Sequence, residues 1–189
     1  MRGKNSTKFL LEGEYPLKTV VVYSHAMKKQ TKTAWPWLFL TAFLILLDQV
    51  TKHWVLLRVT PLDDIPIFPF LNIVLRLNSG AAFSFLGGQD GWQVYFLAAV
   101  SLVVSVMLVI WLARLPRGEW WIACPVSMVL GGAVGNLIDR IQYHYVVDFI
   151  DFHLGAWHFA TFNIADAAVS VGATWLIARV VYEGLVGES

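Results

Sequence analysis

Residues 91–113, GWQVYFLAAVSLVVSVMLVIWLA, decide the fold because they contain no charged side chain. A stretch of about 20 apolar residues is long enough to cross the hydrocarbon core of a bilayer as an α-helix. Three further apolar stretches of similar length surround it, at 35–57, 120–140 and 164–182. In lipid each stretch must satisfy its own backbone hydrogen bonds, as a helix does. We therefore predict an all-α polytopic membrane protein with four transmembrane helices.

The composition of the whole chain supports this interpretation. Of the 189 residues, 57% are hydrophobic and only 14% are charged, and the mean hydropathy is +0.60. A soluble domain has about 25% charged residues, so an ordinary soluble domain is excluded. The formal net charge is +1, which provides no positive field for nucleic acid. The single cysteine, Cys124, lies in an apolar stretch and has no intrachain disulfide partner.

The first 26 residues differ from the remainder of the chain. They mix charges, glycine and proline with short apolar patches, and they lack the long apolar core and cleavage site of a secretory signal. Met27 then opens a Lys-rich segment and is a plausible natural start. We expect residues 1–26 to be an N-terminal extension, and residues 27–189 to form the membrane domain.

Positively charged residues before the first stretch and between the second and third predict the orientation in the membrane. They are Lys28, Lys29, Lys32, Arg114 and Arg117. Lysine and arginine are enriched in cytoplasmic loops, so both termini are predicted to lie in the cytoplasm. The two longer connections, about 58–90 and 141–163, then lie on the outer face.

These outer connections have patterns of their own. Apolar and polar residues alternate along 71–78, which predicts a strand in a small extracytoplasmic β-sheet. Residues 142–163, QYHYVVDFIDFHLGAWHFATFN, are rich in aromatic residues and histidine, as is typical of an interfacial helix or loop in the headgroup region. Together the two connections would cover a site at the outer membrane surface.

Ionisable residues in or beside the spans are costly and are therefore candidate functional residues. They are Asp48, Lys52, Asp139, Arg140, Asp148, Asp151 and Asp166. The predicted topology brings them all to the outer side of the bilayer. Two neighbouring carboxylates that share one proton can activate water, which is the chemistry of an aspartic peptidase.

Residue types alone leave two other interpretations open. In the first, the carboxylates are structural: Asp48 pairs with Lys52, Asp139 pairs with Arg140 or a cation of the outer loops, and Asp166 caps a helix. In the second, they form the relay of a small proton-coupled transporter. Transport requires a polar path across the bilayer, and the second span has no charge.

Other chemistries find less support in the sequence. The histidines at 144, 153 and 158 lack the paired spacing of a zinc-binding helix, so no metal is predicted. Gly131, Gly132 and Gly135 predict close helix packing in the third span. Asn136, Asp139 and Arg140 follow at helical spacing as a polar stripe.

Five motifs resemble those of one known family, and they occur in that family's order. They are LDQVTK (47–52), NSGAAFSF (78–85), GGAVGNLIDR (131–140), VVDFIDF (146–152) and FNIADAAVSVG (162–172). The chain resembles the lipoprotein signal peptidases, the type II signal peptidases of bacteria. The resemblance implies a four-helix aspartyl endopeptidase of the bacterial cytoplasmic membrane, without a cofactor. Such an enzyme removes the signal peptide from diacylglyceryl-modified prolipoproteins, cutting before the lipidated cysteine at the outer leaflet surface.

The resemblance also implies roles for individual residues. Asp148 and Asp166 match the catalytic aspartates of the family, which leaves Asp139 and Asp151 outside the catalytic pair. The residues that correspond to polar positions shaping the site are Asp48, Lys52, Asn78, Gly80, Asn136, Asp139, Arg140 and Asn163. The implied partners are lipid-modified prolipoproteins and membrane lipids, with no nucleic acid and no obligate protein partner.

Overall fold

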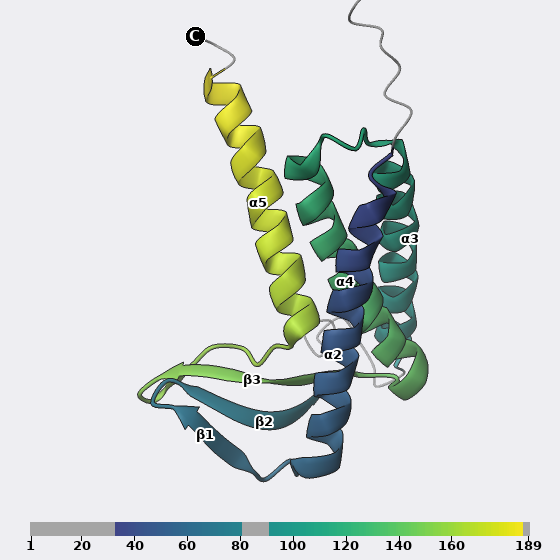
Figure 1. Cartoon of the computed structure of the whole chain (residues 1–189). Coiled ribbons are helices and arrows are strands. Elements are labelled where there is room, and N and C mark those ends of the chain that lie inside the picture. Colours follow the sequence, from purple (N-terminus) through teal and green to yellow (C-terminus); the bar gives the residue numbers. More distant parts are fainter. Residues whose placement is uncertain (1–32, 81–90, 187–189) are drawn as a thin grey trace, which may run out of the picture. The chain divides into compact units, whose positions relative to one another are not determined.

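The computed structural model describes residues 33–80 and 91–186 (Figure 1). Within these residues, four helices are long and apolar enough to cross a membrane. They are α2 (Leu38–Arg58), which extends the short 3₁₀ helix η1 (Trp35–Trp37), α3 (Trp92–Arg114), α4 (Trp120–Tyr143) and α5 (Ile164–Val186). The ends of these four helices lie within four residues of the ends of the predicted spans. The expected extension, residues 1–26, lies outside the described residues.

Local sequence signals explain where the helices begin and end. Pro36 lies in the first turn of η1, where its missing N–H costs no hydrogen bond. Arg58 and Arg114 occupy the last turns of α2 and α3. α4 ends at His144, which adopts a left-handed conformation with φ of 63° and donates its backbone N–H to the carbonyl of Arg140.

The helix α4 is the centre of the bundle and packs against each of the other three long helices. Small residues permit its close approach to α5. A Cβ atom added to Gly132 would lie 2.2 Å from the carbonyl oxygen of Ala165, and one added to Gly172 would lie 2.8 Å from that of Pro125. The glycines of the third span therefore act in helix packing, as the sequence predicts.

Four strands form one antiparallel sheet in the order β1-β2-β3-β4. They are β1 (Asp64–Phe68), β2 (Leu71–Asn78), β3 (Val146–Leu154) and β4 (Trp157–His158). The sheet lies at the end of the bundle where α2 ends and α5 begins (Figure 1). A buried apolar cluster that includes Val55, Leu75 and Val147 joins α2 to β2 and β3.

The strand predicted at 71–78 is confirmed as β2. Residues 141–163 contain β3, which the sequence analysis expected as an interfacial helix or loop. The residues from Val146 to Phe149 are all buried, so this part of β3 lacks the alternation of apolar and polar residues that predicts a half-exposed strand. Arg76 of β2 lies opposite Asp148 of β3. Because β3 also contacts α2 and α4, Asp148 lies where the sheet meets the helix bundle.

Candidate active site

Asp148 and Asp166 meet where β3 and α5 approach the end of α4. Asp148 lies on β3 and is 3% exposed, and Asp166 lies in the first turn of α5. Asn163 precedes α5 and caps it reciprocally with Asp166. The Asp166 N–H donates to Asn163 Oδ1 at 2.8 Å, and the Asn163 N–H donates to Asp166 Oδ2 at 3.2 Å. This arrangement is a capping box that fixes the Asp166 carboxyl.

Two asparagine side chains connect the carboxyl groups. Asn163 Nδ2 donates to Asp148 Oδ1 at 2.8 Å and to Asn136 Oδ1 at 3.2 Å. Asn136 Nδ2 donates to Asp166 Oδ1 at 2.7 Å. A continuous hydrogen-bonded path thus runs from one carboxyl to the other through amides that cannot titrate, which fixes the orientation of both carboxyl groups.

A third amide holds Asp148 from the side of the sheet. Asn78 Nδ2 donates to Asp148 Oδ2 at 3.0 Å, while Asn78 Oδ1 accepts from the Gly80 N–H at 2.9 Å. Gly80 has φ of 83°, a conformation that favours glycine and that allows this tight turn. Gly80 therefore contributes to the site by orienting Asn78.

The surroundings of Asp148 favour its protonated form. The pKa of Asp148 is raised from 3.8 to about 6, mainly by burial and also by the negative charge of Asp166. The hydrogen bonds from Asn78 and Asn163, and the positive charge of Lys52, partly oppose this effect. A carboxyl with such a pKa can exchange a proton near neutral pH.

Beneath the two carboxyls lies a buried ionic network centred on Lys52, which is 2% exposed. Lys52 Nζ lies 2.8 Å from Asp48 Oδ2 and 2.8 Å from Asp139 Oδ2. It also donates to Asn136 Oδ1 at 3.0 Å. All three N–H groups of the ammonium thus have an acceptor, which is the condition for burying such a charge. The Lys52 charge is connected to Asp166 through Asn136.

The carboxylates of this network also hold the backbone of the site. Asp48 Oδ1 accepts from the Ala165 N–H at 2.9 Å, in the first turn of α5. Asp139 Oδ2 accepts from the Val147 N–H at 3.1 Å, one residue before Asp148. The two acids therefore anchor the segments that carry Asp166 and Asp148. Asp48 pairs with Lys52 as expected, and Asp139 pairs with Lys52 instead of its neighbour Arg140.

A pocket of about 320 Å³ opens beside Asp166 between α3, α4 and α5. Its polar end is formed by Asp166, Asn136 and Arg140, and Val100, Val104, Val129, Ala133 and Val169 are among the residues of its walls. Arg140 Nη1 donates to the carbonyl of Asn136 at 3.2 Å, which holds the guanidinium beside the pocket. The pocket can therefore accept an apolar segment that carries a polar group at one end.

Comparison with known proteins places this geometry in a family. The family model of signal peptidase (SPase) II matches residues 40–182. A lipoprotein signal peptidase of Coxiella burnetii (strain Dugway 5J108-111) is 51% identical over 149 residues, covering 79% of this chain and 91% of the relative. The chain belongs to the signal peptidase II family. It is therefore a multi-pass membrane peptidase of the aspartic type.

Two further comparisons agree with this assignment. A lipoprotein signal peptidase of Hydrogenovibrio crunogenus is 47% identical over 151 residues, covering 80% of this peptidase and 88% of the relative. A solved structure described as a bacterial membrane enzyme, determined by the in meso method, superposes with a TM-score of 0.69 at 29% identity. That match covers 77% of this peptidase and 92% of the solved chain.

All ten residues that the sequence analysis assigned to the site lie in this one region of the peptidase. Asp151 is held elsewhere, because its carboxylate pairs with His158 Nδ1 at 2.9 Å. Gln49 belongs to the ionic network but was missed. Its Nε2 donates to Asp139 Oδ1 at 2.9 Å, to Asp48 Oδ2 at 3.2 Å and to the Gly135 carbonyl at 3.1 Å. Its position three residues before Lys52, on the same helix face, is the signal that identifies it.

Proposed function

We propose that this peptidase removes the signal peptide from prolipoproteins with Asp148 and Asp166 as its two catalytic carboxyl groups. The observation that carries the proposal is the path of asparagine amides that joins the two carboxyls in one buried site. In this proposal the substrate carries a diacylglyceryl group on a cysteine, and the peptide bond before that cysteine is cut.

Catalysis requires one proton to be shared between the two acids. The ionised carboxylate takes a proton from water, and the oxygen of that water forms a bond to the scissile carbonyl carbon. The protonated carboxyl donates a hydrogen bond to the carbonyl oxygen as negative charge develops there. The C–N bond then breaks, and a carboxyl proton passes to the leaving amine. The raised pKa of Asp148 suits the residue that first holds the shared proton.

The pocket beside Asp166 supports a role in substrate binding. Its apolar walls are suited to the hydrophobic segment next to the scissile bond, and Arg140 at its polar end is suited to a backbone carbonyl. Asp48, Lys52 and Asp139 are then positioning residues, because their hydrogen bonds go to the backbone and to Asn136.

The proposed orientation places the site at the outer leaflet and both termini in the cytoplasm of a bacterial cell. Thr33, at the start of the first span, forms a β-bridge with Pro116 in the α3–α4 connection. The start of the first span and the basic α3–α4 connection therefore lie at one end of the bundle, and in the sequence Lys28, Lys29 and Lys32 directly precede Thr33, which agrees with the rule for positive residues. The diacylglyceryl anchor of the substrate would reach the opposite end from within the outer leaflet.

A transporter is not favoured by the distribution of buried charge. Within the described residues, the buried charged side chains of the spans are Asp48, midway along α2, and Lys52 and Asp139, in the halves of α2 and α4 nearer the sheet. A proton relay would need ionisable groups in the other half as well.

One assay tests the proposal directly. The purified peptidase is reconstituted with a diacylglyceryl-modified prolipoprotein, and the products are examined by mass spectrometry. We expect a mature product whose N-terminus is the lipidated cysteine. A substrate that remains intact with folded enzyme, or a cut at another bond, would contradict the proposal. The same prolipoprotein without its lipid is the matched control, and we expect it to be cleaved poorly.

A further inference from the structure

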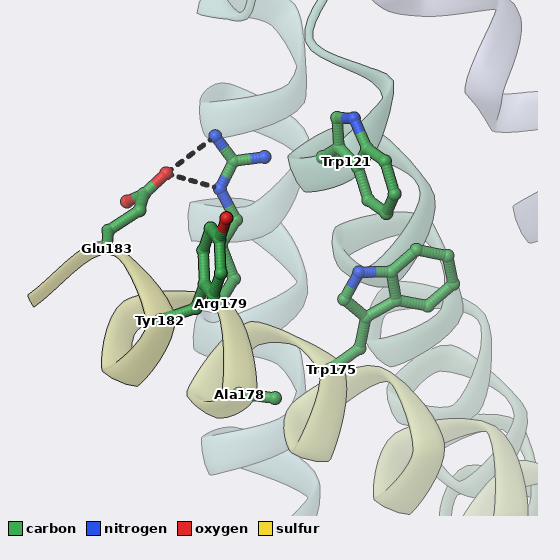
Figure 2. A pocket seen from close by; sticks show the side chains of 6 residues that line it. All are labelled: Trp121, Trp175, Ala178, Arg179, Tyr182 and Glu183. Carbon is green, nitrogen blue, oxygen red and sulfur yellow. Dashed lines mark hydrogen bonds and ion pairs between the residues drawn. The ribbon is translucent and has the colours of Figure 1, made fainter. Parts of the chain in front are cut away.

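A second pocket lies far from the two aspartates, between the first turn of α4 and the last turns of α5 (Figure 2). Its volume is about 540 Å³, within the range of roughly 300–1,000 Å³ found for small-molecule sites. It is lined by Trp121, Trp175, Ala178, Arg179, Tyr182 and Glu183. Arg179 follows Asp166 by 13 residues on the same helix, which corresponds to about 20 Å along the axis. The pocket is thus separate from the proposed active site.

Aromatic rings form the wall of this pocket. The rings of Trp121 and Trp175 meet edge to face, with centroids 6.1 Å apart. Trp120 stacks on Trp121 with a centroid distance of 3.7 Å and extends the cluster. Tryptophan and tyrosine near the ends of spanning helices lie at the level of the lipid headgroups. Trp121 lies in the first turn of α4 and Tyr182 near the end of α5, whereas Trp175 lies midway along α5, so the pocket extends from the headgroup level toward the acyl chains.

A pair of opposite charges completes the pocket. Arg179 Nε and Nη2 both lie 2.8 Å from Glu183 Oε1. A guanidinium carries five N–H groups, and this pair engages only its Glu183 side. Figure 2 shows the remaining nitrogen on the side of the guanidinium that faces away from Glu183. Pairs at this spacing also stabilise a helix, but helix stabilisation does not require the aromatic pocket beside them.

We propose that this pocket binds a phospholipid with a phosphoethanolamine headgroup. The phosphate would accept hydrogen bonds from Arg179, and the primary ammonium would donate to the Glu183 carboxylate. An acyl chain would lie against Trp121 and Trp175. The neighbouring positive and negative side chains complement a zwitterion, whereas a purely anionic headgroup would face the Glu183 charge. If the orientation proposed above holds, the lipid belongs to the cytoplasmic leaflet.

Native mass spectrometry of the detergent-purified full chain tests this proposal. The probes are phosphatidylethanolamine, phosphatidylcholine and phosphatidylglycerol with identical acyl chains, and the readout is the apparent Kd of the first lipid adduct. Arg179→Ala is expected to weaken phosphatidylethanolamine binding by about tenfold, the effect of losing a charge-assisted hydrogen bond. Glu183→Gln is expected to remove the preference for ethanolamine over choline, because choline has no N–H donor.

Matched controls make the outcome decisive. Arg114→Ala removes an exposed arginine at the same end of the bundle but outside the pocket, and it should leave lipid binding unchanged. Inorganic phosphate should not displace the lipid, and displacement would indicate a site for free phosphate. Tighter binding of phosphatidylglycerol would overturn the ethanolamine assignment. Equal binding by the parent, Arg179→Ala and Arg179→Gln would overturn the site. Because the readout needs no substrate, it is independent of the proposed peptidase activity.

Discussion

Asn163 Nδ2 lies 2.8 Å from Asp148 Oδ1, and the oxygen of the same side chain caps α5 by accepting the N–H of Asp166 in its first turn. One residue thus fixes both proposed catalytic carboxyls, since it caps the helix of one and donates to the other. The neighbouring Asn136, on α4, also forms two such contacts: its oxygen accepts from Lys52, and its amide nitrogen donates to Asp166. Each amide has an oxygen that accepts from a cation or an N–H group and a nitrogen that donates to a carboxylate, so one side chain can bridge the two.

Asn163→Ser separates the two roles of this residue. Serine still caps a helix, so the loss of stability should be small, whereas alanine should cost about 1 kcal/mol or more. Serine lacks the amide that donates to Asp148, so we expect kcat to fall for both variants to a similar extent. Thermal unfolding and single-turnover cleavage measure the two effects. A serine variant with parental kcat would show that the Asn163 amide does not position Asp148.

The ionic network predicts unequal effects of two substitutions. Lys52→Met leaves Asp48 and Asp139 buried without their cation, which should cost about 3–5 kcal/mol of stability. Asp139→Asn keeps much of the side-chain shape and should cost about 1–3 kcal/mol, with a moderate loss of turnover. Chemical unfolding in detergent and the cleavage assay test this order. If folded Asp139→Asn is as inactive as Asp148→Asn, Asp139 has more than a positioning role.

The pKa of Asp148 predicts how stability depends on pH. Burial raises this pKa from 3.8 to about 6, so the folded protein binds the proton more tightly than the unfolded chain. The stabilising contribution is complete below the ordinary value and is lost as pH rises through about 6. Between pH 4 and 7 the parent should therefore lose thermal stability relative to Asp148→Asn. Melting temperatures across this range measure the difference, and parallel curves for the two proteins would contradict the expectation.

Much of the fold was predictable because apolar stretches as long as a bilayer is thick permit few structures other than helices. β2 was also predictable, since its apolar residues alternate. β3 was not, because its first four residues are all buried and show no period of two. Its pairing with β2, which sets Asp148 opposite Arg76, and with β4 makes it a strand.

The site was predictable in part. Spacing shows that Asp48 and Lys52 share a helix face, but it does not show that Lys52 also reaches Asp139, 87 positions later in the chain. The sequence suggested Arg140 or a cation of the outer loops as the partner of Asp139. Residue types alone did not distinguish Asp148 from Asp151; in the structure Asp148 is joined to Asp166 through asparagine amides, whereas Asp151 pairs with His158.

The orientation predicts which connections are accessible from outside the cell. Cys124 is the single native cysteine, so a Cys124→Ala background allows reporter cysteines to be placed one at a time. Cysteines at exposed positions of the two outer connections, such as Leu62 and Leu154, should react with an impermeant thiol reagent in intact cells. A cysteine at Arg117 in the α3–α4 connection should react only after the cells are opened. The reverse pattern would show that the orientation is inverted.

The proposed catalytic pair predicts a pattern of losses that a structural role would not produce. Asp148→Asn and Asp166→Asn keep the side-chain shape but remove the carboxyl that exchanges a proton with water. Each should lower kcat by several orders of magnitude, and the double variant should be little worse, because residues that act as one unit do not have additive effects. Asp166→Asn retains an oxygen able to accept the Asn163 N–H, so the helix cap should survive. Both variants should still bind the lipidated prolipoprotein, measured by co-purification. An Asp166→Asn protein that folds, binds and cleaves at nearly the parental rate would refute the aspartyl mechanism.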